Sequence, residues 1–245
     1  EVRPDVIYHL AGQADVAASW LSPIETMRVN VEGTHNILEV ARTFGVAKVL
    51  TVSSADIYGV VAPEELPIVE SAPLRPVSPY AASKAAADLV ALQAHLGHGQ
   101  DVVRARAFNH LGPGQSKSFV GAGFAARIAA AERSGDDELQ TGDLTPRRDF
   151  TDVRDVVRAY RLLATEGRPG VAYNICSGTS VSIGELAGLL LGLTDARMRL
   201  VEDPDLLRPV ELPELRGDAS LLRRHTGWAP SISLDETLSD VLEDW

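Results

Sequence analysis

Short apolar segments alternate with long helical patterns along most of the chain, and this alternation restricts the fold more than any other feature. The segments that predict strands are residues 6–12, 48–53, 101–107 and 171–176, and those that predict helices are residues 24–44, 80–96, 123–133, 152–165, 183–193 and a last one from about 234. Pro23 is expected to open the first of these helices, and Gly45 and Gly97 are expected to end the first and the second. Strands separated by helices are typical of parallel βαβ units. The sequence therefore predicts an α/β protein with a doubly wound parallel sheet.

The composition excludes several classes of function. The chain has 23 Lys and Arg against 34 Asp and Glu, a formal charge of −11, so neither nucleic acid nor an anionic membrane surface is an expected partner. Cys176 is the only cysteine, which leaves no disulfide framework and no zinc cluster, and fits a reducing cytoplasm. No apolar run approaches the ~20 residues of a membrane-spanning helix. We therefore expect a cytoplasmic protein without a metal, in which a few placed arginines hold any anionic substrate.

Tyr80 and Lys84 are the first candidates for catalysis. They are four residues apart in a predicted helix, so their side chains share one face. A tyrosine hydroxyl has a pKa of about 10, and a neighbouring ammonium is expected to lower that pKa, so the pair can act as a general acid and base on a carbonyl–alcohol couple. Surface helices carry the same spacing by chance. Ser53 and Ser54 favour the catalytic interpretation, because they end the preceding strand and ligands of parallel sheets lie at that edge.

Several motifs resemble those of the extended short-chain dehydrogenase/reductase family. They are His9-Leu10-Ala11-Gly12, Asn30-Val31-Glu32-Gly33-Thr34, Ser53-Ser54-Ala55-Asp56-Ile57-Tyr58-Gly59 and Pro79-Tyr80-Ala81-Ala82-Ser83-Lys84. The resemblance covers essentially the whole chain. It implies a Rossmann-type domain, a catalytic Ser54, Tyr80 and Lys84, and NAD or NADP as the cofactor. The residues that it implies around this cofactor are Leu10, Ala11, Gly12, Asn30, Val52, Ser53, Tyr80 and Lys84.

The family also has a glycine-rich phosphate turn after its first strand, followed by an acidic or basic residue that selects the ribose. This sequence starts where the fourth strand of the family is expected. The N-terminal strands of the Rossmann-type domain, with the phosphate turn and the ribose selector, are therefore expected to be missing from it. We accordingly expect weak dinucleotide binding by this polypeptide, and no preference between NAD and NADP can be predicted.

Further segments resemble the GDP-sugar members of the family. Residues 108–115 and 118–120 are similar to a motif of the reductases that convert GDP-4-keto-6-deoxymannose to GDP-rhamnose. Residues 142–153 and 208–212 are similar to the nucleotide-binding segments of GDP-mannose dehydratases and reductases. The resemblance implies a GDP-sugar substrate. The residues that it implies in contact with this substrate are Asn109, Phe119, Val120, Arg148, Arg208 and Glu211.

The same resemblance divides the chain into two domains of two segments each. Residues 1–108 and 150–180 are expected to form the partial dinucleotide-binding domain, and residues 109–149 and 181–245 a smaller C-terminal nucleotide-sugar-binding domain.

A homodimer is also expected, built on the helices that begin near Ile24 and Tyr80. The second of these helices is apolar on nearly every face, and a helix that is apolar all round is buried on both sides.

The predicted reaction is the reduction of the 4-keto group of GDP-4-keto-6-deoxymannose to GDP-rhamnose with NAD(P)H. In family dehydratases a glutamate, often preceded by an aspartate, follows the catalytic Ser or Thr, and here Ala55 and Asp56 stand in those places. Asp56, a further candidate catalytic residue, is one methylene shorter than Glu, which favours the reductase. The alternatives are a GDP-mannose 4,6-dehydratase, another nucleotide-sugar 4-epimerase, and an inactive truncated dimeric remnant.

Overall fold

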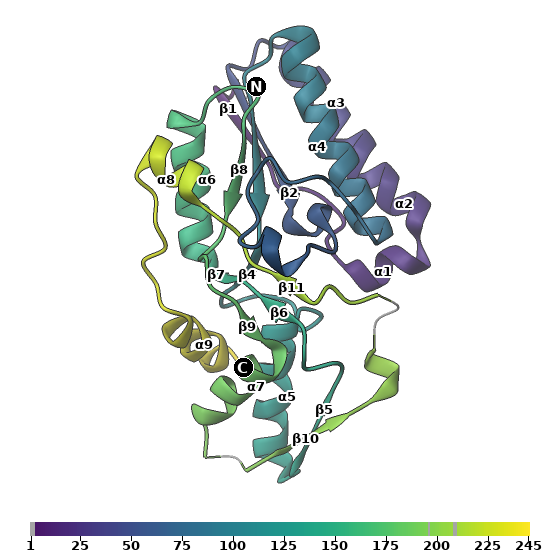
Figure 1. Ribbon diagram of the computed structural model, residues 1–245, viewed down its shortest axis with the longest axis vertical. Helices are drawn as coiled ribbons and strands as arrows, with labels where there is room; N and C mark the ends of the chain where they lie inside the picture. The colour runs from purple at the N-terminus through teal and green to yellow at the C-terminus, as the bar shows by residue number, and fades with distance from the viewer. Residues whose placement is uncertain (1–2, 196, 208–209) are drawn as a thin grey trace.

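Four parallel strands form the central sheet of the computed structural model, which describes residues 3–195, 197–207 and 210–245 (Figure 1). The strands are β1 (Val6–His9), β2 (Lys48–Ser54), β3 (Val102–Ala107) and β8 (Ala172–Ile175), in the order β1-β2-β3-β8. Each strand pairs in parallel with the next. Every residue of β3 and β8 is buried, as expected of a parallel sheet that is covered on both faces.

Helices cover both faces of this sheet (Figure 1). On one face they are α2 (Pro23–Met27), a π-helical turn (Arg28–Glu32), α3 (Gly33–Thr43) and α4 (Pro79–His98), with the short α1 (Val16–Leu21) packed against α4. On the other face they are α6 (Val153–Glu166) and α8 (Ser220–Thr226). This arrangement confirms the predicted doubly wound α/β fold. Among the described helices, none combines the length and the apolar character that crossing a bilayer requires.

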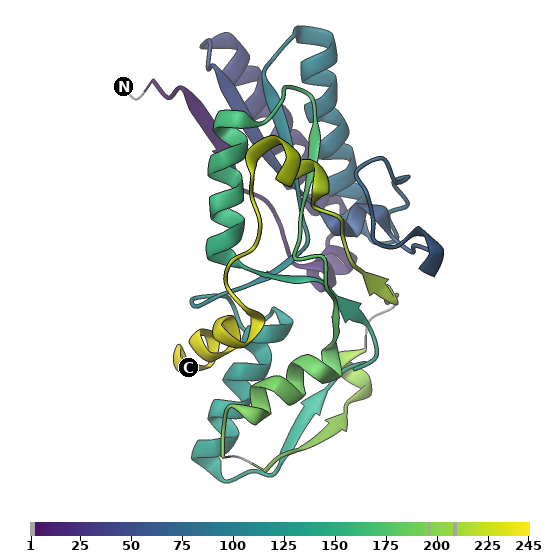
Figure 2. The same ribbon diagram turned by 60° about the vertical axis from the view of Figure 1, so that its left-hand side comes forward.

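Most of the remaining elements lie toward the end of the molecule opposite the N-terminus (Figures 1 and 2). The helices are α5 (Val120–Ser134), α7 (Ile183–Gly192) and α9 (Leu234–Glu243). The strands are β4 (Asn109–Leu111) with β7 (Phe150–Asp152), β5 (Glu138–Thr141) with β10 (Arg199–Glu202), and β6 (Arg147–Arg148) with β9 (Val181–Ser182) and β11 (Glu214–Leu215). Phe124, Leu190 and Leu238 belong to a second hydrophobic core among these helices. The described 3₁₀ turns are Ala55–Tyr58, Pro63–Glu65 and Pro204–Leu206.

The structure differs from the predicted elements at several boundaries. The helix predicted over residues 24–44 contains the π-helical turn, in which Asn30 is buried. Gly97 does not end α4, which continues to His98 because Gly99, at φ 69°, supplies the left-handed cap. β1 stops at His9, and α1, α8 and the short strands outside the central sheet were not predicted. These elements are too short to show a periodic pattern, and tertiary packing stabilises them.

A buried cluster of charges joins α4 to β3. Asp88 Oδ2 accepts hydrogen bonds from Arg104 Nη1 at 2.5 Å and from Arg106 Nη2 at 2.8 Å, and its Oδ1 accepts from Arg106 Nε at 3.2 Å. The Asp88 side chain is 0% exposed. Arg106 also donates to the Tyr58 hydroxyl at 3.0 Å and to the Glu70 carbonyl at 2.9 Å. Charges away from water are tolerated only when they are paired and hydrogen-bonded, so Asp88 determines where α4 lies on the sheet.

We expect the substitution Asp88→Asn to destabilise the fold strongly. It keeps the shape of the side chain but leaves two buried guanidinium groups without their counter-charge, and breaking a buried ion pair in this way costs about 3–5 kcal/mol. Denaturant titration followed by circular dichroism measures the free energy of unfolding. Glu39→Gln is the matched control, because Glu39 pairs with Arg42 on an exposed helix face, and it should leave the unfolding midpoint unchanged. Equal stability of the two variants would contradict this role of Asp88.

Candidate active site

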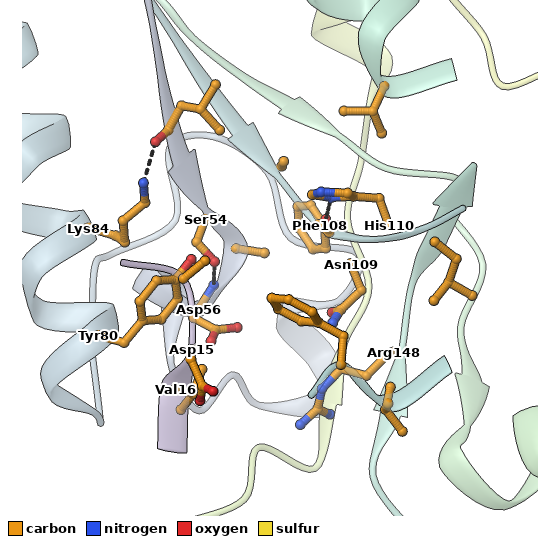
Figure 3. A pocket seen from close by; sticks show the side chains of 18 of the residues that line it. Asp15, Val16, Ser54, Asp56, Tyr80, Lys84, Phe108, Asn109, His110 and Arg148 are labelled. Atoms are coloured by element: carbon orange, nitrogen blue, oxygen red, sulfur yellow. Dashed lines mark hydrogen bonds between the residues drawn. The ribbon is translucent and has the colours of Figure 1, made fainter. Parts of the chain in front are cut away.

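A cleft of about 610 Å³ opens at the carboxyl ends of β1, β2 and β3 (Figure 3). Ligands of parallel α/β sheets bind at this edge. The predicted site residues that line the cleft are Leu10, Gly12, Val52, Ser53, Ser54, Asp56, Tyr80, Lys84, Asn109, Phe119, Val120, Arg148 and Glu211. Ala11 and Asn30 are not among the lining residues, and Arg208 lies outside the described residues.

Tyr80 and Ser54 face each other at one side of the cleft (Figure 3). The hydroxyl of Ser54, the last residue of β2, accepts from the Asp56 amide at 3.2 Å and so caps the 3₁₀ turn that follows. Tyr80 lies in the first turn of α4 and is only 8% exposed. Burial raises the pKa of Tyr80, the Asp56 carboxylate adds to this rise, and the hydrogen bond with Ser54 opposes it. The prediction that Lys84 lowers this pKa is therefore wrong for this structure.

The direction of the Lys84 side chain explains this difference. Its Nζ donates to the Val52 carbonyl at 2.6 Å, and Figure 3 shows the amine directed at that carbonyl and away from the Tyr80 hydroxyl. Burial lowers the pKa of Lys84 to about 8, and the Asp88 carboxylate one helical turn later opposes this shift. The Ser53 hydroxyl donates to the Lys84 carbonyl at 3.2 Å. The end of β2 therefore holds Lys84 by both its side chain and its backbone.

Asn30, which the family resemblance places at the cofactor, does not reach the wall of the cleft. Its Nδ2 donates to the Gln13 carbonyl at 3.0 Å and to the Ser83 hydroxyl at 2.8 Å, and its Oδ1 accepts from the Gln13 amide at 2.8 Å. An asparagine amide has two N–H donors, so both are used within the protein. Asn30 thus holds the segment after β1, and its expected contact with the cofactor stays a prediction. Ala11 is exposed and does not line the cleft either.

Gly12, three residues after the end of β1, lines the cleft and stands close to Asn30 and Lys84. A Cβ at this position would stand 2.9 Å from Asn30 Oδ1 and 3.8 Å from Lys84 Nζ. A side chain here would displace Asn30, which is held by hydrogen bonds, and this explains the glycine. Within the described part of the chain, no group of three or more His, Cys, Asp or Glu is placed so that it could hold a metal ion.

The opposite wall of the cleft follows β3 and contains Asn109, Phe119 and Val120. Asn109 begins β4, and Phe119 and Val120 stand at the start of α5.

His110, for which no role was predicted, also lines this wall, and its Nδ1 lies 3.2 Å from the Phe108 carbonyl. Burial lowers the pKa of His110, which favours the uncharged imidazole. The sequence could have indicated this position of His110, because His110 directly follows Asn109 at the sheet edge where ligands bind.

Gln13, Asp15 and Val16 also line the cleft, although none of them was predicted to do so. Gln13 and Asp15 belong to the segment between β1 and α1, and Val16 is the first residue of α1. Asp15 caps α1 by accepting from the Ala18 amide at 3.1 Å. An aspartate before a run of helix-forming residues predicts a helix start, so α1 could have been found from the sequence, but its position beside the cleft depends on how it packs against α4.

Arg148 is tied to the segment that contains Glu211. Its Nη1 donates to the Leu212 carbonyl at 2.7 Å and to the Arg147 carbonyl at 2.9 Å, and its Nη2 donates to Glu211 Oε2 at 3.1 Å. The Arg148 and Glu211 side chains are 9% and 26% exposed. The structure therefore brings together two residues that stand 63 positions apart and that were predicted to bind the same ligand.

Known proteins resemble the chain over nearly its whole length. It is 40% identical to the GDP-6-deoxy-D-mannose reductase of Pseudomonas aeruginosa, over 99% of this chain and 80% of that relative. It is 35% identical to a dTDP-glucose 4,6-dehydratase of Streptomyces griseus, over 96% of this chain and 70% of that relative. The solved structure of RMD from Pseudomonas aeruginosa complexed with NADPH matches with a TM-score of 0.93 at 40% identity, covering 99% of this chain and 82% of that one. The model of the family described as GDP-mannose 4,6 dehydratase matches residues 1–241. The chain belongs to this family, within the extended short-chain dehydrogenases/reductases.

Proposed function

We propose that this chain is a nucleotide-sugar oxidoreductase that reduces the 4-keto group of GDP-4-keto-6-deoxymannose to give GDP-rhamnose, with NAD(P)H as the reductant. The observation that carries the proposal is the pairing of the Tyr80 and Ser54 hydroxyls in a cleft whose other wall contains Asn109 and Arg148. The 40% identity to a GDP-6-deoxy-D-mannose reductase over 99% of the chain supports this choice of substrate.

Tyr80 is the proton donor in this proposal. Its raised pKa keeps the phenol protonated near neutral pH, and a general acid must carry its proton when the reaction starts. The Ser54 hydroxyl, beside that of Tyr80, donates to the same carbonyl oxygen and so orients it. As C4 is reduced, its oxygen becomes an alkoxide that is basic enough to take the Tyr80 proton. We assign Lys84, whose amine is directed at the Val52 carbonyl and away from the Tyr80 hydroxyl, to the cofactor side of the cleft.

We assign the cofactor to the half of the cleft formed by residues 1–108 and 150–180. Leu10, Gly12, Val52 and Ser53 line this half together with Tyr80 and Lys84. When bound, NAD(P)H supplies the hydride. The chain's own residues orient the carbonyl and hold the proton at the Tyr80 oxygen.

We assign the nucleotide sugar to residues 109–149 and 181–245. Asn109, Phe119, Val120, Arg148 and Glu211 all line this half of the cleft. The bonds from Arg148 to the Leu212 carbonyl and to Glu211 hold its guanidinium in place beforehand. A guanidinium that is held in this way can bind phosphate oxygens with little loss of side-chain entropy, which suits the diphosphate of a GDP-sugar.

A GDP-mannose 4,6-dehydratase is the second candidate, and Asp56 is the observation that favours it. The Asp56 carboxylate lines the cleft and lies close enough to Tyr80 to raise its pKa. A dehydratase needs a carboxylate within about 2.6–3.2 Å of the proton that it abstracts. The side chain of Asp56 is one methylene shorter than that of the glutamate expected in dehydratases, and a misplacement of about 1 Å can cost ~10²-fold in rate.

Two substrates distinguish these reactions. With GDP-4-keto-6-deoxymannose and NADPH, the latter in large excess because we expect weak dinucleotide binding, the absorbance of the reduced cofactor should fall. GDP-mannose alone should give no 4-keto sugar. Tyr80→Phe should reduce the rate of cofactor oxidation by ~10²-fold or more with little change in KM, because it removes the proton and leaves the cleft intact. Steady release of the keto sugar from GDP-mannose, abolished by Asp56→Ala, would establish the dehydratase instead.

The reaction should also depend on pH through Lys84. Its pKa, lowered to about 8 by burial, means that the ammonium loses its proton as pH rises through this value. A neutral amine brings neither charge nor its third hydrogen to the cofactor that we place beside it, so kcat/KM for the reduced cofactor should fall above about pH 8, measured between about pH 6 and 10. Unfolding midpoints over the same range serve as the control for loss of the fold. A constant kcat/KM up to about pH 10 would remove Lys84 from this role.

We infer that the protein is a homodimer through the outer faces of α2, α3 and α4. These helices expose large apolar side chains, among them Ile24, Val40, Leu89 and Leu96, and patches of this kind mark interaction surfaces. We expect light scattering at micromolar concentration to give about twice the chain mass of 26.2 kDa, and Leu89→Asp to shift the mass toward that of one chain. A monomeric mass for the unaltered chain would contradict the inference.

We also infer a reducing, cytoplasmic compartment. Cys176 is the only cysteine in the sequence. It is buried, and burial raises the pKa of its thiol well above the usual value. A buried thiol with a raised pKa is an unreactive packing residue, so the described structure does not depend on a disulfide.

A further inference from the structure

Both polar groups of the Tyr80 backbone are held by buried serine hydroxyls. The Tyr80 amide donates to Ser19 Oγ at 3.1 Å, and Ser83 Oγ donates to the Tyr80 carbonyl at 2.7 Å. Ser19 and Ser83 are both 0% exposed. The backbone that carries the proton donor is therefore fixed at two points, and one of them is 61 residues away in the sequence.

The bond to Ser19 satisfies a need that α4 creates. The first N–H groups of a helix have no partner within the helix. Pro79, at the first helical position, has no N–H, and the Ala81 amide donates to the Ser78 hydroxyl at 3.1 Å. The Tyr80 amide does have an N–H, it is buried, and the Ser78 hydroxyl is already bonded to the Ala81 amide. Ser19 supplies the missing acceptor from α1.

Ser19 also connects Tyr80 to the wall of the cleft. Its hydroxyl donates to the Val16 carbonyl at 2.6 Å, and Val16 lines the cleft next to Asp15, the cap of α1. The chain of bonds therefore runs from the cleft wall at Val16, through one hydroxyl, to the backbone of Tyr80.

Ser83 makes a second connection to the same segment. It accepts from Asn30 Nδ2 at 2.8 Å, and Asn30 in turn holds both the carbonyl and the amide of Gln13, at 3.0 and 2.8 Å. Gln13 lines the cleft as Val16 does. The two ends of the segment from Gln13 to Val16 are thus tied to the amide and the carbonyl of Tyr80. We call this segment, residues 13–16, the strap.

We propose that the strap positions Tyr80 and that Ser19 is the positioning residue through which it does so. Ser19 contacts neither the substrate nor the cofactor in this account, and acts only on the backbone of α4. Fixing this backbone keeps the Tyr80 hydroxyl beside that of Ser54. The catalytic consequence rests on the proposed function, because it assumes that Tyr80 is the proton donor. The structural consequence, an α4 first turn held by Ser19, does not.

The test compares Ser19→Ala with Ser22→Ala. Ser22 is an exposed serine at the other end of α1, and its hydroxyl caps no helix, so this change removes a hydroxyl from the same region without touching the strap. Hydrogen–deuterium exchange of the Tyr80 amide is the first measurement. In Ser19→Ala this buried amide has no acceptor, and we expect its exchange to be faster than in Ser22→Ala by on the order of tenfold.

Steady-state kinetics with GDP-4-keto-6-deoxymannose and NADPH give the second measurement. A displaced Tyr80 should lower kcat by about 10- to 100-fold in Ser19→Ala, with KM close to that of Ser22→Ala, because the cleft residues that bind ligand are unchanged. Ser83→Ala breaks the second connection, so it should also accelerate exchange of the Tyr80 amide and lower kcat. It provides the test if Ser19→Ala does not fold.

The outcomes separate the two proposals. If both serine variants match Ser22→Ala in exchange and in kcat, the strap does not position Tyr80 and the inference is wrong. If exchange at Tyr80 accelerates but the unaltered chain reduces no 4-keto sugar, the strap stands and the proposed function fails. If exchange accelerates while kcat is unchanged in an active protein, the bond to Ser19 only stabilises the helix, and a positioning role for Ser19 is excluded.

Discussion

The placement of α4 depends on the pairing of Asp88 with Arg104 and Arg106. Arg104 and Arg106 lie on β3, in the middle of the parallel sheet, and their side chains are buried. Their positive charges therefore need a buried carboxylate as a partner. Asp88 supplies it from α4. Lys84 and Tyr80 stand one and two turns before Asp88, at spacings of four residues, so they share its face of the helix. Fixing Asp88 against β3 therefore turns Tyr80 and Lys84 toward the ends of the strands, where the cleft lies.

Burial then determines the protonation of the site. Removal from water disfavours the charged form of each group, so it raises the pKa of Tyr80 and lowers that of Lys84. A higher pKa for the phenol and a lower pKa for the amine both favour the uncharged form of the side chain. A phenol that keeps its proton suits the reduction of a carbonyl, in which the enzyme gives a proton away. The Asp56 carboxylate strengthens this tendency at Tyr80, even though its shorter side chain argues against a base at C5.

Hydrogen bonds between distant segments complete the site. The strap ties the wall of the cleft to the Tyr80 backbone through Ser19 and through Asn30 with Ser83. On the opposite wall, the bonds of Arg148 to Glu211 and to the Leu212 carbonyl draw the C-terminal segment over the cleft. Each of these links spans more than fifty positions in the sequence. The cleft is therefore shaped by tertiary contacts on both sides, while the ends of the parallel strands form its base.

The sequence by itself determined the doubly wound sheet and most of the candidate site. Alternating apolar and helical patterns have a local physical cause, and parallel strands bring their carboxyl ends together, so the sequence pattern alone places Ser54, Tyr80 and Lys84 at one edge of the sheet. Only the tertiary structure decided which way these groups point and what they contact. It turned Lys84 toward the Val52 carbonyl, buried Asn30 away from the cleft, and joined Ser19 to Tyr80. A hydrogen bond or a pKa shift depends on the atoms that surround a group in space, and residues far apart in the chain supply those atoms without leaving a local pattern.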